Sequence, residues 1–167
     1  MAVKPRCEQL KPREIDHQVV AAVLSNKGRI GLFRRSNKVS GDVGLWHCIT
    51  GFLSNADSPL TQALVEIEEE VGICGDKLQL CSSAWFDLLG NDGITWRVHA
   101  FHFLCQTEAL TLNWENDAAS WVFANQLHLY PTVTWLDNVF TALAPADGYF
   151  GHPPPVAETD YRRDPIF

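Results

Sequence analysis

GFLSNADSPLTQALVEIEEEVGI, residues 51–73, carries the strongest structural signal in the chain. Ser58 followed by Pro59 is typical of a helix start, because serine can cap the first turn and proline has its backbone angle pre-set for it. Gly72 after Val71 indicates the helix end, since glycine readily adopts the left-handed conformation found there. Between these signals, apolar residues recur at steps of three and four. We therefore predict a helix after a glycine loop, with a buried face made of Leu60, Ala63, Leu64, Ile67 and Val71.

The same helix concentrates negative charge. Glu66, Glu69 and Glu70 stand at positions i, i+3 and i+4, so they gather within one turn on a face adjacent to the apolar one. Like charges at this spacing destabilise a helix by about 0.2–0.5 kcal/mol per pair. A divalent cation turns this repulsion into coordination, because hard cations such as Mg²⁺ prefer carboxylate oxygens. The pattern predicts a metal site, and its alternative is an acidic helix face exposed to solvent.

Composition limits the classes of function. A chain of 167 residues suits a single domain. The net charge of −7 argues against broad binding of nucleic acid, which needs a basic surface, but it allows a nucleotide ligand. The five cysteines are scattered without CxxC spacing, which favours a reduced compartment. The N-terminal residues contain no apolar signal segment, and no stretch is long enough to span a bilayer. We expect a soluble, cytoplasmic protein with no membrane attachment.

The order of elements predicts an α/β fold. We expect strands at residues 17–24, 29–34, 45–50, 79–89, 95–105 and 121–123, and a second helix at 134–143. Strand 95–105 has apolar residues on both faces, so we place it centrally in the sheet. A single domain would cover residues 1–144, with an N-terminal arm at 1–16 and an exposed loop at 35–44. Residues 145–167 form a proline-rich tail that is either extended or docked on a partner, which allows a homodimer.

Residues 51–73 resemble the Nudix box, GX5EX7REUXEEXGU with U an aliphatic residue. The positions that match without a gap are Gly51, Glu66, Ile67, Glu69, Glu70, Gly72 and Ile73. The resemblance implies the Nudix α/β/α sandwich, with a mixed central sheet, over residues 17–143. This pattern is far more specific than a lone glycine motif.

Two positions depart from the box. Asp57 stands where the family usually has glutamate, and Val65 stands where it has arginine. In the family, the glutamate and the arginine at these positions resemble a structural ion pair that orients the catalytic glutamates. Because Val65 is uncharged, we expect Asp57 to turn to the amide groups at the helix N-terminus, where an anion is favoured.

A second resemblance lies outside the box. The segments GLWHCITGFL, WENDAASWV and YPTVTWLDNVFTAL are similar in layout to the dihydroneopterin triphosphate pyrophosphatase branch of the family. In that branch a glutamate a few residues before a tryptophan acts as an additional acid near the metals. Glu115, six residues before Trp121, matches this position. The alternative for Glu115 is an acid in a surface loop.

The resemblance implies a reaction and its catalytic groups. Water attacks a phosphorus of a diphosphate linkage, in a nucleoside diphosphate joined to a group X or a related nucleotide. Mg²⁺, or Mn²⁺ in its place, would be held by the Gly51 carbonyl, Glu69 and Glu70. Glu66 would bind the metal or take the proton of the attacking water, and Glu115 is the competing candidate for this base.

Substrate-binding candidates come from the loops and strands around the box. Arg34 is our candidate for the phosphates, whereas we interpret Arg35 and Lys38 as a solubilising turn. Trp46 is either a core residue or a surface for base stacking. Trp96 and Arg97 follow the turn at residues 90–93 and are candidates to line the pocket for X, with a core position as the alternative for Trp96.

Histidines offer no alternative metal site, because His99 and His102 have opposite strand parity and should point to different faces. Two other functions remain open. One is a catalytically silent Nudix module that binds a nucleotide-type ligand or a partner without cleaving it, which the departures at Asp57 and Val65 favour. The other is a relative of isopentenyl diphosphate isomerase, although no cysteine stands in the context that this family uses.

Overall fold

The computed structural model describes residues 14–54 and 58–144. The predicted N-terminal arm lies mostly outside the described residues, and the C-terminal tail and Asp57 lie wholly outside them. The strands are β1 (His17–Asn26), β2 (Arg29–Arg35), β3 (Trp46–His47), β4 (Ile49–Phe52), β5 (Leu78–Leu89), β6 (Thr95–Cys105) and β7 (Asn116–Val122). The helices are α1 (Pro59–Val71) and α2 (Leu136–Leu143), with short 3₁₀ helices η1 (Gly75–Lys77) and η2 (Ala124–Leu129).

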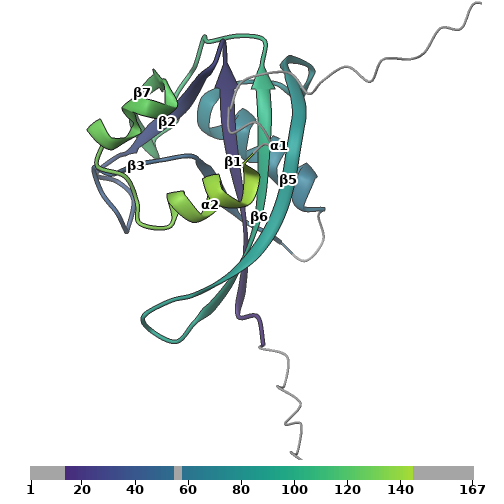
Figure 1. The fold of residues 1–167 in the computed structure, drawn as a ribbon, viewed down its shortest axis with the longest axis vertical. Coiled ribbons are helices and arrows are strands. Elements are labelled where there is room, and N and C mark those ends of the chain that lie inside the picture. Colours follow the sequence, from purple (N-terminus) through teal and green to yellow (C-terminus); the bar gives the residue numbers. More distant parts are fainter. Residues whose placement is uncertain (1–13, 55–57, 145–167) are drawn as a thin grey trace, which may run out of the picture.

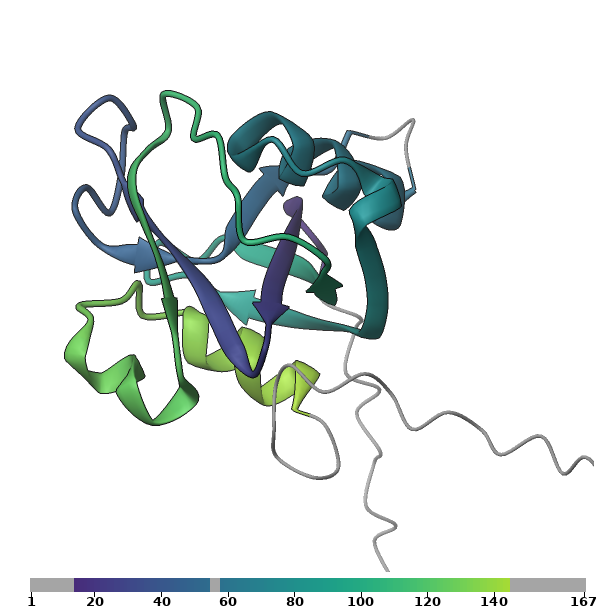
Figure 2. The ribbon, with the colours of Figure 1, turned by 90° about the horizontal axis from the view of Figure 1, so that it is seen from above.

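Helices α1 and α2 cover opposite faces of a mixed sheet, which in the described residues has seven strands (Figures 1 and 2). Strand β1 pairs in parallel with β6, and β5 adds antiparallel to β6 at the edge. Over its first half β1 also pairs with β4, whereas it meets β2 only at the hairpin between them. Strand β2 then diverges from β1 and carries β3 and β7 with it (Figure 1). This divergence leaves room for a cleft beside β4.

Strands β1 and β6 bury both of their faces, as predicted for 95–105. On the α1 side, Leu24 and Phe103 pack with Ile67 of the helix. On the α2 side, Val23 packs with Val139 of the second helix. These two clusters form the core. The opposite parity of His99 and His102 is confirmed by their separate partners, which are Gln18 and Ser25.

Both ends of α1 fall where the sequence predicts them. The Ser58 hydroxyl accepts a hydrogen bond from the Thr61 amide at 3.1 Å, and Pro59 is the first helical residue. At the other end Gly72 has a φ of +72° and donates its amide to the Glu68 carbonyl. The buried face differs in two members, because Leu60 is exposed and Glu70 is buried.

Other boundaries depart from the prediction. The last strand starts at Asn116 rather than at residue 121, because β2 offers an open edge that pairs with the small residues Ala118 and Ala119. The strand predicted at 45–50 divides into β3 and β4, which pair with β2 and β1 respectively. Helix α2 begins after Trp135, its N-cap residue. Within the described residues, no helix is both long and apolar enough to cross a bilayer.

Candidate active site

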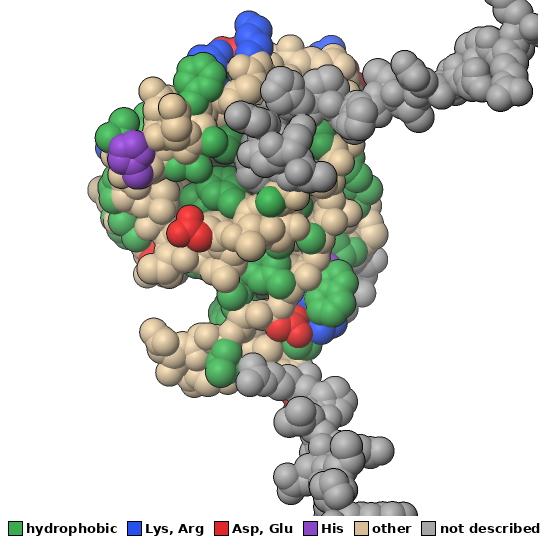
Figure 3. All heavy atoms as spheres, viewed as in Figure 1, with side chains coloured by type: hydrophobic (Ala, Val, Ile, Leu, Met, Phe, Trp, Pro, Cys, Tyr) green, Lys and Arg blue, Asp and Glu red, His purple; other side chains and the backbone are tan. Residues whose placement is uncertain are grey.

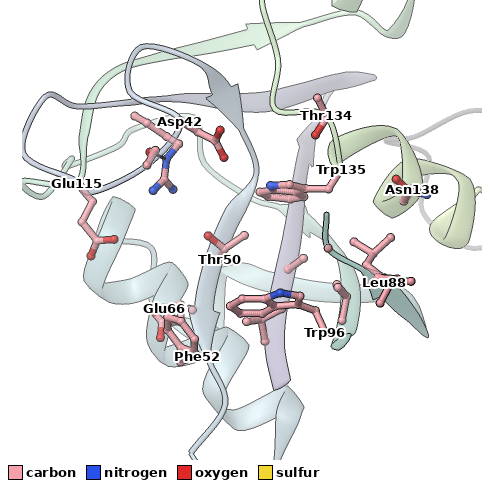
Figure 4. Close-up of a pocket in the computed structure, with 18 of the residues that line it drawn as sticks. Asp42, Thr50, Phe52, Glu66, Leu88, Trp96, Glu115, Thr134, Trp135 and Asn138 are labelled. Carbon is pink, nitrogen blue, oxygen red and sulfur yellow. Dashed lines mark hydrogen bonds between the residues drawn. The ribbon is translucent and has the colours of Figure 1, made fainter. Parts of the chain in front are cut away.

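A cleft of about 1030 Å³ opens on the α2 side of the sheet, above β1 and β6. Its floor is apolar and includes Val19, Ala21 and Val98. The tip of the β5–β6 hairpin forms one wall, and the molecule is visibly hollowed beside it (Figure 3). Glu66 and Glu115 lie at one end of the cleft, and Trp96 and Trp135 lie towards the other (Figure 4).

The acidic end joins three carboxylates from two separate segments. Glu66 and Glu69 come from α1, and Glu115 precedes β7. The side chain of Glu66 lies against the backbone of Gly51, so closely that a Cβ atom at this position would overlap with the Glu66 carboxylate. Gly51 therefore leaves room for the Glu66 carboxylate, which would have to move aside for a residue with a Cβ atom. On the other side, Gln62 donates a hydrogen bond from Nε2 to Glu66 Oε1 at 2.8 Å.

The pKa of Glu66 reflects this environment. Burial raises the pKa above the ordinary value of a glutamate, and the negative charges of Glu69 and Glu115 raise it further. The hydrogen bond from Gln62 acts in the opposite direction, because it stabilises the carboxylate. Mutual repulsion of this kind is what a bound cation relieves.

Glu70 does not share this end of the cleft. Its side chain is only 1% exposed, and both of its carboxylate oxygens accept hydrogen bonds, from the Thr50 amide at 3.2 Å and from Asn116 Nδ2 at 2.7 Å. Glu70 therefore does not line the cleft with Glu66 and Glu69, although the three glutamates lie within one turn of α1 as predicted. Its position lies three residues after Ile67, at the border of the apolar face, and the two donors make its burial possible.

Burial shifts the pKa values of Glu70 and of the nearby His47. It raises the pKa of Glu70 to about 8, against the opposing effect of the hydrogen bonds from Asn116 and Thr50. Asn116 uses its amide nitrogen for Glu70, so its Oδ1 must accept from His47 Nε2, at 2.9 Å. Burial lowers the pKa of His47 to about 4, so the imidazole is neutral. The chain Glu70–Asn116–His47 thus links α1, β7 and β3.

The donors at the acidic end fit a hard divalent cation. Carboxylate and carbonyl oxygens are the preferred ligands of Mg²⁺, and Glu66, Glu69, Glu115 and the Gly51 backbone supply them around one space. Among the residues that the structure describes, no three acidic, histidine or cysteine side chains already converge as a finished metal site. The site therefore fits Mg²⁺ in donor type and requires side-chain adjustment to close around it.

Of the four predicted substrate-binding residues, Trp96 lines the cleft. Arg34 forms an ion pair with Asp117 and lies over the Trp46 ring. Trp46 in turn packs edge-on against Tyr130. These two side chains are not part of the cleft lining.

Arg97 also lies outside the cleft, where it pairs with Asp87 and covers the ring of Trp85 at 4.5 Å. Strand parity explains its position, because Arg97 follows Trp96 and points to the opposite face.

Sequence reasoning missed several residues that line the cleft, among them Arg35, Trp135 and Asn138. Arg35 was interpreted as part of a solubilising turn. A register shift between Arg34 and Arg35 separates the two arginines, and Arg35 reaches the cleft while its Nε donates to the Gly41 carbonyl at 2.7 Å. Trp135 and Asn138 are three residues apart at the start of α2, and this spacing could have indicated that their side chains lie on the same side of the helix.

The α/β/α sandwich and the acidic cleft define a scaffold of the kind used by metal-dependent hydrolases. The model of the NUDIX domain family matches residues 16–143, and the chain belongs to this family. It is accordingly a Nudix hydrolase. A comparison with curated protein sequences finds no significant match.

Solved structures share the fold at low sequence identity. A Nudix hydrolase from M. smegmatis, RenU, superposes with a TM-score of 0.64 at 17% identity, covering 75% of this chain and 81% of that one. The NUDIX domain of Shewanella oneidensis NrtR, complexed with ADP ribose, gives 0.62 at 15% identity, covering 80% and 91%. The E. coli dihydroneopterin triphosphate pyrophosphohydrolase gives 0.59 at 15% identity, covering 78% and 98%.

Proposed function

We propose that the protein is a Mg²⁺-dependent hydrolase that cleaves a diphosphate linkage, in a nucleoside di- or triphosphate or a nucleoside diphosphate joined to a group X, by attack of water on phosphorus. The observation that carries this proposal is that Glu66, Glu69 and Glu115 all line the same open cleft. The family assignment supports pyrophosphohydrolase chemistry in general. The ADP ribose bound by the NrtR domain supports a nucleotide-type substrate.

Each carboxylate has a proposed role. Glu69 and the Gly51 carbonyl would hold the cation, which when bound supplies charge neutralisation of the diphosphate. Glu66 completes this set or accepts the proton of the attacking water, and its raised pKa suits it to proton transfer. Glu115 faces the same space from the loop before β7 and is the second candidate for the base.

Arg35 and Glu70 have supporting roles. Only Nε of Arg35 donates a side-chain hydrogen bond among the described residues, to the Gly41 carbonyl, and the other guanidinium donors match phosphate oxygens. Glu70 was predicted as a metal ligand, but joining the cation would require it to leave Thr50 and Asn116. We therefore propose that Glu70 holds α1 against β4 and β7.

The cysteines support a proposal for the compartment. The four cysteines within the described residues, Cys48, Cys74, Cys81 and Cys105, are all free thiols. Free thiols persist in reducing compartments, so we propose that the protein works in the cytoplasm.

Turnover measurements test the hydrolase. We expect release of phosphate or pyrophosphate from at least one member of a panel of nucleoside triphosphates, nucleotide sugars and dinucleotides in the presence of Mg²⁺, and none with EDTA. The Glu69→Gln variant should lower kcat by about 100-fold or more, because it removes a charge that holds the cation.

Glu68→Gln is the matched control. Glu68 lies next to Glu69 on α1 but is exposed outside the cleft, so this variant should keep the activity of the wild type. Full activity of Glu69→Gln would contradict the proposal. Tight binding of a nucleotide in calorimetry, without turnover of any panel member, would select the catalytically silent alternative instead.

A further inference from the structure

We infer that Asn113 is a positioning residue, which holds the Glu115 carboxylate at the acidic end of the cleft before a cation or a substrate binds. The inference rests on the proposed function, since Glu115 is one of the acids to which that function gives a role. Asn113 does not line the cleft itself, so its effect on the reaction would be exerted through Glu115.

The Asn113 side chain bonds to Glu115 twice. Its Oδ1 accepts a hydrogen bond from the Glu115 backbone amide at 2.9 Å, and its Nδ2 donates to Glu115 Oε1 at 3.3 Å. The first bond determines the orientation of the Asn113 amide, because a backbone N–H can only donate and must face the oxygen. The nitrogen therefore faces the carboxylate, where a donor stabilises the negative charge.

Repulsion from the other acids would otherwise displace the Glu115 carboxylate. Burial raises the pKa values of Glu66 and Glu70, and the charge of Glu115 raises both further, so the ionised groups repel one another. A glutamate side chain can relieve such repulsion by rotating towards solvent. In Figure 4 the Glu115 carboxylate is instead directed towards α1 and Glu66. The hydrogen bond from Asn113 opposes the repulsion and favours this direction.

One carboxylate oxygen of Glu115 stays available for the reaction. Among the described residues, this carboxylate accepts a hydrogen bond only from Asn113, and it does so through Oε1. Oε2 can therefore contact a cation or a water molecule while Oε1 remains bonded. A carboxylate that is already held in place loses less conformational entropy when it binds.

The backbone of the loop that carries Asn113 is attached to α1. The Asn113 amide donates to the Glu70 carbonyl at 3.0 Å, and the Thr111 amide donates to the Val71 carbonyl at 2.9 Å. Both carbonyls belong to the last turn of the helix, where carbonyl groups lack partners within the helix. Asn113 is thus anchored to the same helix that carries the other two carboxylates of the cleft.

Ser36 fixes the loop from the side of β2. Its amide donates to the Glu115 carbonyl at 2.7 Å, and its hydroxyl donates to the Trp114 carbonyl at 2.6 Å. Ser36 is only 4% exposed and directly follows β2. Glu115 is therefore held at its amide, its carbonyl and its carboxylate, and Asn113 supplies the first and the last of these contacts.

The Asn113→Ser variant separates the two bonds that Asn113 makes. A serine hydroxyl can accept from the amide two residues later, but it is too short to reach the Glu115 carboxylate. We expect crystals of this variant, grown without metal, to show the carboxylate displaced away from Glu66 and the backbone of the loop unchanged. Asn113→Asp keeps the size and the acceptor but replaces the donor with a negative charge. It should displace the Glu115 carboxylate even if the serine variant folds poorly.

A double-mutant cycle shows whether Asn113 acts through Glu115. With Mg²⁺ and a substrate from the panel, Asn113→Ser should lower kcat by about 10- to 100-fold, the usual effect of removing the partner of a carboxylate in a metal site. In the Glu115→Ala background, the same substitution should change kcat by less than about 2-fold. A substitution that only loosened the fold would lower kcat equally in both backgrounds.

Thr107→Ala is the matched control. Thr107 Oγ1 accepts from the Ala109 amide at 3.1 Å, which is the same kind of turn bond in the same connection between β6 and β7. Thr107 does not line the cleft, so this variant should keep the wild-type kcat and the wild-type position of Glu115. The inference is overturned if the Glu115 carboxylate keeps its position in Asn113→Ser and Asn113→Asp crystals, or if Asn113→Ser has the same effect on kcat with and without Glu115.

The two measurements distinguish this inference from the proposed function. A displaced Glu115 carboxylate in the variant crystals, with no hydrolysis of any panel member by the wild type, would support positioning by Asn113 and contradict the hydrolase. An unchanged carboxylate position together with Mg²⁺-dependent hydrolysis would support the hydrolase and overturn the inference.

Discussion

Gln62 lies where its side chain can partly replace the arginine that the Nudix pattern has at the position of Val65. The Nudix pattern has an arginine at the position of Val65, and Val65 is exposed on the helix surface at 41%. One turn before Glu66, Gln62 donates to the same carboxylate that the acidic end of the cleft depends on. We therefore assign to Gln62 the positioning of Glu66, together with the close approach at Gly51.

Replacing Gln62 should alter the pH dependence of the reaction. The Gln62→Leu variant loses the hydrogen bond that lowers the pKa of Glu66, so this pKa should rise further. Glu66 must be ionised to act, and activity therefore falls as pH drops below its pKa. We expect the acidic limb of the kcat/KM profile to move to higher pH, and kcat to fall by about 10-fold.

Val65→Thr is a suitable control for this variant, because it changes a neighbouring exposed position of similar volume without touching Glu66. It should leave the pH profile unchanged. An acidic limb that stays in place in Gln62→Leu, or moves to lower pH, would contradict the positioning role of Gln62.

The position of an individual residue could be predicted where the helical spacing of the sequence determines it. Glu66 and Glu69 fall in the cleft because their place on α1 follows from sequence spacing alone. Glu70 could not be assigned in this way, since its burial depends on Thr50 and Asn116, which are distant in sequence. Arg35 was misinterpreted because a local irregularity of β2, invisible in the sequence, decides its direction.

At the scale of elements, the capping residues at its two ends determine where α1 begins and stops. Its N-cap and C-cap rest on side-chain and backbone chemistry within a few residues, so the sequence predicts them well. Strand β7 shows the opposite case. Its residues have weak strand propensity, and only the open edge of β2, more than eighty residues away, makes them a strand.

The C-cap of α1 offers a direct test. Gly72 has a φ of +72°, and a Cβ atom there would lie 3.1 Å from the Thr111 Cβ. Gly72→Ala should therefore lower the free energy of unfolding by about 1–2 kcal/mol, because a left-handed conformation is costly for residues with a Cβ atom. Urea denaturation measures this change.

Gly75→Ala provides the comparison. Gly75 follows the helix closely, has no positive φ, and has no atom within 4 Å of an added Cβ. The substitution should change the free energy of unfolding by less than about 0.5 kcal/mol. Equal effects of the two substitutions would contradict the proposed role of the cap.

At the scale of the whole molecule, the split pairing of β1 creates the cleft. Because β4 occupies the first half of β1 and β2 only its end, the sheet opens between them and α1 meets β4 at Gly51. The fold class and the place of the helix between the strands could be predicted from the Nudix box. The presence of both Trp96 and Trp135 in the lining of one cleft could not be predicted, because it depends on how the β5–β6 hairpin faces α2.

The net charge of −7 bears on how the cleft works. A polyanionic substrate approaching an acidic protein, and an acidic end within the cleft, is repelled unless a cation accompanies it. Binding of a polyanionic substrate would therefore depend on a divalent cation at Glu66 and Glu69 more than on any other feature.

Crystals soaked in MnCl₂ and measured at the manganese absorption edge would locate this cation. We expect an anomalous peak at the acidic end of the cleft, in contact with the carboxylates of Glu66 and Glu69 and the Gly51 carbonyl, with Glu70 still bonded to Thr50 and Asn116. No peak at this end of the cleft, with manganese found only at exposed acids such as Glu68, would contradict the account.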